Sequence, residues 1–206
     1  EFKLNLRQTF LFSSLAWFMV AVFGSLPFLL SSQNFNFSDA FFESMSGITT
    51  TGATIISDLD NSPKSILLWR AIMQWLGGIG IVVMAITILP LLKVGGMQLF
   101  KMEGPDSTEK ILPRTIEVAA IIISTYLILT FFCGFFYWFF GMSVFDSICH
   151  AMTTIATGGY STKSESLAAF GSSSIEIIII FGMIVGSLPF VHYLSISKNV
   201  DSFFSS

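Results

Sequence analysis

The sequence predicts an all-α membrane protein of two tandem units, each with a spanning helix, a short re-entrant helix and loop, and a second spanning helix. The first observation is composition, because 53% of the 206 residues are hydrophobic and only 11% are charged, whereas soluble domains carry about 25% charged residues. The second is a set of four apolar segments, each long enough to cross a bilayer. The third is a short stretch ending in Thr and Gly that occurs twice, each time between two apolar segments.

The four predicted transmembrane helices follow the apolar segments in chain order. Crossing the hydrocarbon core takes about 20 apolar residues, and each segment meets that length with few or no charges. The predicted spanning helices cover residues 10–30 and 65–92 of the first unit (1–97), and 115–140 and 175–194 of the second unit (98–206).

Arg70 is the only charged residue within the second predicted helix, and it lies near the start of that helix. An arginine at the bilayer centre would cost about 2.5–3.5 kcal/mol on insertion scales. We therefore expect its side chain to snorkel to the outer surface. Trp69, Tyr137 and Trp138 are expected at the same interface, where amphipathic aromatic rings gather.

The basic residues predict which side of the membrane each segment faces. Seven Lys and Arg lie in the N-terminal stretch, the central loop and the C-terminal tail, against three on the opposite side. Because cytoplasmic segments carry the excess of Lys and Arg, both termini are expected in the cytoplasm, and the re-entrant helices are expected to enter from outside. The central loop is expected to hold anionic membrane lipids. The chain has no basic patch with interleaved aromatic residues, so no nucleic-acid partner is predicted.

The duplicated stretch aligns at a constant offset of 107 residues, which pairs Asp39 with Asp146 and Gly52 with Gly159. Each copy begins with an N-cap residue followed three positions later by a carboxylate, a combination that stabilises a helix start. A Thr-Gly pair after a helix is by itself most often only a C-cap and turn. The shared register of the two copies argues for more, and predicts re-entrant pore helices over 36–49 and 143–156.

The loops after these helices, 49–54 and 156–161, are predicted to be the two walls of a cation filter. A dehydrated cation needs oxygen ligands in place of water, and backbone carbonyls can supply them. Glycine permits the unusual backbone angles that aim successive carbonyls at one axis, and the carbonyl end of each short helix favours a cation. The carbonyls of Gly52 and Gly159 are the predicted ligands. The full predicted filter set is Thr50, Thr51, Gly52, Thr157, Gly158 and Gly159.

Three ionisable residues of the short helices, Asp39, Glu43 and His150, are candidates for an outer vestibule that concentrates cations. In the alternative interpretation, Asp39 caps its helix, while Glu43 and its aligned partner His150 brace the short helices by hydrogen bonds. We favour bracing for Glu43 and His150, although ionisable groups at membrane depth are functional candidates by default.

No enzyme activity is predicted. Cys149 and His150 are adjacent, and neighbouring residues on a helix point about 100° apart, so they do not form a nucleophile–base pair. Cys133 lies within an apolar run. Both cysteines are expected to be small buried hydrophobes rather than a disulfide framework.

Three segments, 45–54, 154–162 and 68–83, resemble the Trk/Ktr/HKT superfamily of potassium transporters. The resemblance covers almost the whole chain, with its motifs in the family's order. It implies potassium uptake across the bacterial inner membrane, with K⁺ bound by the carbonyls of Gly52 and Gly159 and no covalent cofactor. It also implies a homodimer and a TrkA-like cytoplasmic regulatory subunit, on which alone a nucleotide would be expected.

The family's pore arranges four such units around one axis, whereas this sequence contains two. We therefore expect either a fragment or a half-pore that two further units, or a second chain, would complete. Two alternatives from other functional classes stay open: a non-conducting structural or regulatory membrane subunit, and a re-entrant-loop channel for a neutral solute.

Overall fold

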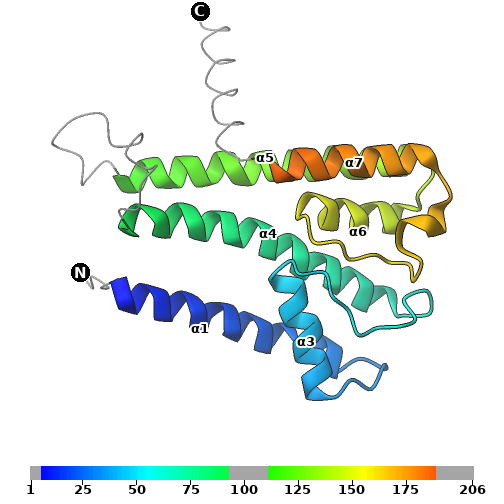
Figure 1. Ribbon diagram of the computed structural model, residues 1–206, viewed down its shortest axis with the longest axis horizontal. Coiled ribbons are helices and arrows are strands. Elements are labelled where there is room, and N and C mark those ends of the chain that lie inside the picture. The colour runs from blue at the N-terminus through cyan, green and yellow to red at the C-terminus, as the bar shows by residue number, and fades with distance from the viewer. Residues whose placement is uncertain (1–5, 93–110, 189–206) are drawn as a thin grey trace, which may run out of the picture.

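The computed structural model describes residues 6–92 and 111–188, and every regular element within them is helical (Figure 1). This agrees with the predicted all-α class. The elements are α1 (Leu6–Gly24), α2 (Leu26–Leu29), α3 (Phe37–Ile48), α4 (Lys64–Leu92), α5 (Ile111–Phe139), α6 (Val144–Ile155), the 3₁₀ helix η2 (Ser166–Phe170) and α7 (Ser173–Ser187).

Three helical stretches of the described chain are long and apolar enough to cross a membrane: Arg7–Leu29, Lys64–Met84 and Ala119–Phe139. The fourth predicted helix, 175–194, corresponds to α7, which has 15 residues and ends at Ser187. Leu188 is extended, with ψ 139°, as the residue before a proline prefers. The rest of the predicted helix, 189–194, lies outside the described residues.

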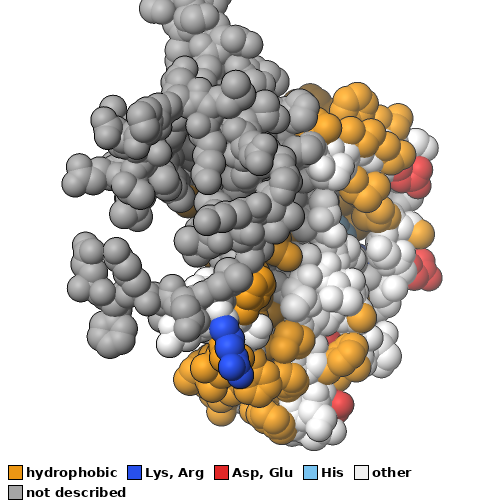
Figure 2. All heavy atoms as spheres, turned by 60° about the vertical axis from the view of Figure 1, so that its left-hand side comes forward, with side chains coloured by type: hydrophobic (Ala, Val, Ile, Leu, Met, Phe, Trp, Pro, Cys, Tyr) orange, Lys and Arg blue, Asp and Glu red, His pale blue; other side chains and the backbone are white. Residues whose placement is uncertain are grey.

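The outer faces of the long helices are apolar. Phe12 on α1, Phe131 on α5 and Phe181 on α7 are each two-thirds exposed or nearly so. Figure 2 shows hydrophobic side chains over wide areas of one described face, with acidic side chains at its margin. So many exposed large apolar side chains are unusual for a soluble monomer and suit contact with lipid.

The two short helices lie between the long ones (Figure 1). α3 contacts α1 and α4, whereas α6 contacts α5, α7 and also α4. α4 therefore belongs to the first unit in sequence but touches the short helices of both units. This shared helix joins the two halves of the described structure.

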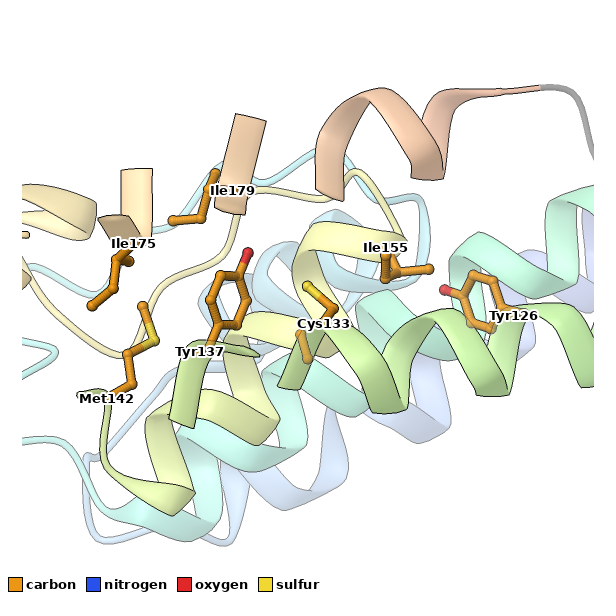
Figure 3. Packing of buried hydrophobic residues seen from close by; sticks show 8 residues of the cluster. Tyr126, Cys133, Tyr137, Met142, Ile155, Ile175 and Ile179 are labelled. Atoms are coloured by element: carbon orange, nitrogen blue, oxygen red, sulfur yellow. The ribbon is translucent and has the colours of Figure 1, made fainter. Parts of the chain in front are cut away.

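The core of the second unit is formed by α5, α6 and α7, whose side chains point toward one another in Figure 3. Tyr137 is fully buried there, and its hydroxyl lies 2.9 Å from that of Thr154. The Tyr137 side chain, expected among the aromatic residues of the outer interface, turns inward to α6 instead of facing lipid. Cys133 and Cys149 are buried and free, as expected.

Glycines let the carbonyl ends of the short helices lie directly against α4 and α7. A Cβ at Gly77 would collide with the carbonyl oxygen of Ile48, at the end of α3. A Cβ at Gly186 of α7 would lie 2.9 Å from the carbonyl oxygen of Ile155, at the end of α6. Ile48 and Ile155 are aligned in the repeat, so both units use a glycine for the same close approach.

Candidate functional site

The loops after α3 and α6 have the same backbone conformation. Thr50 and Thr157 have φ of 55° and 53°, and Gly52 and Gly159 both have φ of 80°. Both pairs are related by the repeat offset, so the duplication extends from sequence to backbone. A β-branched residue at positive φ is uncommon, and such conformations cost on the order of 1–3 kcal/mol each. The same strain, present twice, argues for a constraint beyond simple chain reversal.

The helix ends that precede the loops are also matched. In the first copy, the N–H of Thr50 donates to the carbonyl of Gly47 (3.0 Å), and that of Thr51 donates to the carbonyl of Ser46 (2.9 Å). This pair of bonds is a Schellman motif. The C-cap interpretation is thus correct for the local bonding, but the left-handed position holds threonine rather than the usual glycine. The equivalent bonds of the second copy run from Thr157 to Thr154 (3.0 Å) and from Gly158 to Thr153 (2.9 Å).

Each short helix begins with the predicted cap. The Asn36 side chain accepts from the N–H of Asp39 at 2.8 Å, and the Ser143 hydroxyl accepts from the N–H of Asp146 at 3.1 Å. Asp39 is half-buried. Asp146 also accepts a hydrogen bond from the hydroxyl of Thr162, at 2.6 Å. That contact ties the start of α6 to the chain that leaves the second loop.

Glu43 is fully buried and forms an ion pair with Arg70, whose Nε lies 2.6 Å from Oε1 of the carboxylate. The same carboxylate accepts from the Thr54 hydroxyl (2.9 Å) and from the N–H of Ile55 (3.1 Å). These contacts are those of a brace, not of an exposed vestibule carboxylate. The expectation that Arg70 snorkels to the surface is wrong, because the buried carboxylate offsets the cost of burying its charge.

His150 occupies the aligned position in the second copy and is also buried. Its Nε2 lies 3.4 Å from the hydroxyls of both Ser161 and Thr162. These two residues align with Thr54 and Ile55, the partners of Glu43. One position of each short helix therefore braces the same two residues after its loop, with a carboxylate in one copy and an imidazole in the other. Both residues are buried and hydrogen-bonded, which fits the favoured bracing interpretation better than the vestibule.

The two loops touch each other. A Cβ at Gly52 would collide with the carbonyl oxygen of Gly158, whereas a Cβ at Gly159 would meet nothing within 4 Å. Along residues 157–160, exposed and buried positions alternate: Thr157 and Gly159 are exposed, whereas Gly158 and Tyr160 are buried. The second loop therefore alternates between an open side and a side held by the protein. On the first loop, Thr51 is exposed.

Gln74 and Tyr160 complete the site, and neither was among the predicted site residues. The Gln74 amide, fully buried in α4, contacts the backbone of Gly158 and Tyr160. The Tyr160 hydroxyl donates to the carbonyls of Glu43 (3.0 Å) and Ala53 (3.2 Å) in the first unit. A polar amide in the middle of an apolar spanning helix was the available signal for Gln74.

Beyond the two loops, a polar link joins the chain segments of the two units. The N–H of Leu59 donates to the hydroxyl of Ser164 (3.0 Å), and the N–H of Ser164 donates to the Asp60 carboxylate (3.2 Å). Lys163 also lies 3.3 Å from that carboxylate. The backbone N–H of Ser164 is the main group that holds the pKa of Asp60 below its ordinary value of 3.8.

The oxygens of the loops are the groups of this site that could bind a cation. Within the part of the chain that the structure describes, no group of three His, Cys, Asp or Glu side chains could hold a metal ion. Thr51, Thr157 and Gly159 are exposed on these loops, which follow the carbonyl ends of α3 and α6. Neutral oxygen ligands suit a weakly held monovalent cation that must leave again.

A family model for TrkH, described as a cation transport protein, matches residues 1–201. The chain belongs to the TrkH family. Among curated TrkH-family relatives, the Trk system potassium uptake protein TrkH of Vibrio parahaemolyticus is 43% identical over 200 residues, covering 95% of this chain and 41% of that protein. TrkH of Escherichia coli K12 is 45% identical over 199 residues, with the same coverage of 95% and 41%.

The fold of this TrkH-family chain is also known from a solved structure. The crystal structure of the potassium transporter TrkH from Vibrio parahaemolyticus matches with a TM-score of 0.84 and 40% identity, covering 96% of this chain and 40% of that one. The chain therefore spans about two fifths of the length of the TrkH proteins that it matches.

Proposed function

We propose that this chain forms two walls of a pore for potassium uptake across the bacterial inner membrane. The observation that carries the proposal is the repeated loop, with matched positive φ at Thr50 and Thr157 and at Gly52 and Gly159. Strain conserved within an internal repeat is expected where backbone oxygens must hold a set geometry. Relatives named as potassium uptake proteins support potassium as the ion.

We assign the carbonyls of Gly52 and Gly159 as potassium ligands, with Thr50, Thr51 and Thr157 supplying further oxygens on the same loops. The open space beside Gly159 supports this assignment. Gly158 takes a supporting part in the filter, because its carbonyl already accepts a hydrogen bond from Gln74. The partial negative charge at the carbonyl ends of α3 and α6 adds to the attraction for a cation.

The short helices serve as re-entrant pore helices. α3 and α6 have 12 residues each, which gives a length of about 18 Å, well short of the roughly 30 Å hydrocarbon core. With the excess of Lys and Arg on the cytoplasmic side, both pore helices enter from outside and both termini lie in the cytoplasm. Asp39, at the outer end of α3, stays a candidate for the vestibule.

Two further pore-loop units, or a second chain, complete the ring. The fact that the chain spans about two fifths of its relatives supports the first arrangement. The complete protein would assemble as a homodimer within membrane lipid, with a TrkA-like regulatory subunit on the cytoplasmic side. Potassium is the transported ion rather than a cofactor, and any nucleotide binds only the separate regulator.

The test is Gly159→Arg in the full-length protein, expressed in cells that depend on it for growth at low potassium. We expect growth at low potassium to be lost while the protein still reaches the membrane. Gly171→Arg is the matched control, because Gly171 also has positive φ (54°) and open space around it, but lies beyond the filter. Growth of the Gly159→Arg cells would instead favour the non-conducting subunit, and uptake of a neutral solute without current would favour the third class.

A further inference from the structure

Gln74 lies in the middle of α4 and is fully buried, and both the N–H and the oxygen of its amide form hydrogen bonds with the second unit. Its Nε2 donates to the carbonyl of Gly158 at 2.8 Å, and its Oε1 accepts from the N–H of Tyr160 at 3.1 Å. One side chain therefore holds the residues on both sides of Gly159, and leaves Gly159 itself facing open space.

The chemistry of the contact requires an amide. A carboxylate could accept from the N–H of Tyr160, but it would place a second oxygen against the Gly158 carbonyl. An apolar side chain would leave a carbonyl and an N–H buried without partners, at a cost of about 1–3 kcal/mol each. Among side chains of this length, glutamine supplies one donor and one acceptor at any pH, whereas glutamate supplies a donor only when it is protonated.

Close packing, as well as the hydrogen bonds, fixes the position of Gly158 between Gln74 and Gly52. A Cβ at Gly158 would collide with the Gln74 amide, and a Cβ at Gly52 would collide with the Gly158 carbonyl. The Gln74 amide therefore packs against Gly158, and the Gly158 carbonyl packs against Gly52. A change of side chain at Gln74 is expected to shift the backbone of both loops.

Arg70, one turn earlier on α4, extends the support. Its Nη1 donates to the carbonyl of Ser161 at 3.2 Å, and its guanidinium carbon lies 4.0 Å from the centre of the Tyr160 ring. Together with Gln74, it holds the backbone of residues 158–161 from the neighbouring unit. The geometry of the second loop therefore depends on α4 of the first unit.

We propose that Gln74 is a positioning residue that sets ion specificity: by fixing Gly158 and Tyr160 to α4, it sets where Gly159 presents its oxygen to the ion. This inference rests on the proposed potassium uptake. Discrimination between K⁺ and Na⁺ depends on how closely the filter oxygens approach the ion and how freely they move. Loss of the Gln74 contacts lets the second loop relax toward the smaller ion without removing any ligand.

The experiment compares Gln74→Glu and Gln74→Met in the full-length protein, reconstituted in liposomes with K⁺ or Na⁺ as the only permeant cation. Both substitutions keep the length of the side chain. We expect the ratio of Na⁺ to K⁺ uptake to rise about tenfold in each, which corresponds to about 1.4 kcal/mol, within the range for an unsatisfied buried polar group. The matched control is Gln33→Glu, since the Gln33 amide bonds to Ser62 in the outer loop, away from the filter.

The outcomes separate this inference from the proposed function. If the unsubstituted protein carries no K⁺, the proposed function fails. If it carries K⁺, and both Gln74 variants reach the membrane with an unchanged ion ratio, the positioning role is wrong. If neither variant folds while Gln33→Glu does, Gln74 serves folding rather than specificity, and the inference is also overturned.

Discussion

The loops after α3 and α6 have matched backbones but are supported from different directions. The first is held mainly by its own helix, because Glu43 bonds to Thr54 and Ile55, and the Ser46 hydroxyl donates to the carbonyl of Ala53 at 2.6 Å. The second unit adds one contact to it, from the Tyr160 hydroxyl to the same carbonyl. The second has its own brace at His150 and is also held by α4 of the first unit. The comparison teaches that the two units are not independent modules, since one unit supports the other's loop.

The helices that follow the two loops show the same asymmetry. Gly77 of α4 and Gly186 of α7 each lie against the last carbonyl of the preceding short helix. We therefore treat these two glycines as equivalent positions when the two helices are compared. In this alignment, α7 carries Met183 and Ile179 where α4 carries Gln74 and Arg70. Met183 is about half exposed. α7 therefore offers an apolar face where α4 offers buried polar support.

The largest expected difference between the two units comes from replacing the residues that brace their loops, Glu43 in the first and His150 in the second. Glu43→Gln leaves Arg70 buried without a counter-charge, and we expect it to destabilise the folded protein by about 3–5 kcal/mol. The aligned change His150→Gln replaces neutral hydrogen bonds only, and we expect it to cost about 1 kcal/mol. Thermal unfolding of the detergent-solubilised full-length protein measures both.

A third variant serves as the control for the ion pair. Combining Glu43→Gln with Arg70→Met removes the unpaired charge, so the double variant is expected to recover most of the lost stability. Equal effects of Glu43→Gln and His150→Gln, with no recovery in the double variant, would contradict the difference between the two braces.

Local features of this chain were predictable from sequence, because they depend on neighbouring residues. The caps at Asn36 and Ser143 and the duplicated loops depend on spacings of a few residues and on one constant offset. Arg70 shows where such reasoning fails. Its environment is set by Glu43, 27 positions earlier, and an insertion cost calculated for an isolated arginine leaves that partner out.

The next comparison concerns the strained threonines. Replacing Thr50 or Thr157 with glycine relieves the positive-φ conformation, and we expect each variant to gain about 1 kcal/mol of stability. Ion selectivity should respond differently, because the second loop is also held by Gln74 and Arg70. We expect Thr50→Gly to raise the ratio of Na⁺ to K⁺ uptake several-fold, and Thr157→Gly to change it by less than about twofold.

The measurement uses the same liposome assay together with thermal unfolding. Equal changes in selectivity would mean that the support from α4 does not rigidify the second loop. A loss of stability in either variant would mean that the threonine side chain contributes more than its backbone strain costs. The contact between the Thr49 and Thr51 hydroxyls, at 2.8 Å, shows that side chains of the first loop also interact.

Contacts between the units could not be predicted, because no local pattern specifies which distant segments meet. Tyr160 reaches Ala53, which is its own aligned partner in the first copy, and nothing in either copy alone indicates that contact. Tyr137 is of a residue type that gathers at membrane interfaces, but its side chain packs inward against Thr154. Gln74 is the exception, since a lone amide in an apolar helix marks a polar contact even when its partner is unknown.

The smallest expected effect tests the polar link between the units. Asp60 is exposed and its pKa lies below 3.8, chiefly because of the Ser164 backbone N–H. A carboxyl with a lowered pKa stabilises the folded state above its ordinary pKa, and loses this contribution as the pH falls through its lowered pKa. We therefore expect Asp60→Asn to unfold at a slightly lower temperature than the unsubstituted protein at pH 7, and the difference to shrink progressively below pH 3.8. A difference that persists unchanged at low pH would mean that the Asp60 charge does not join the two units.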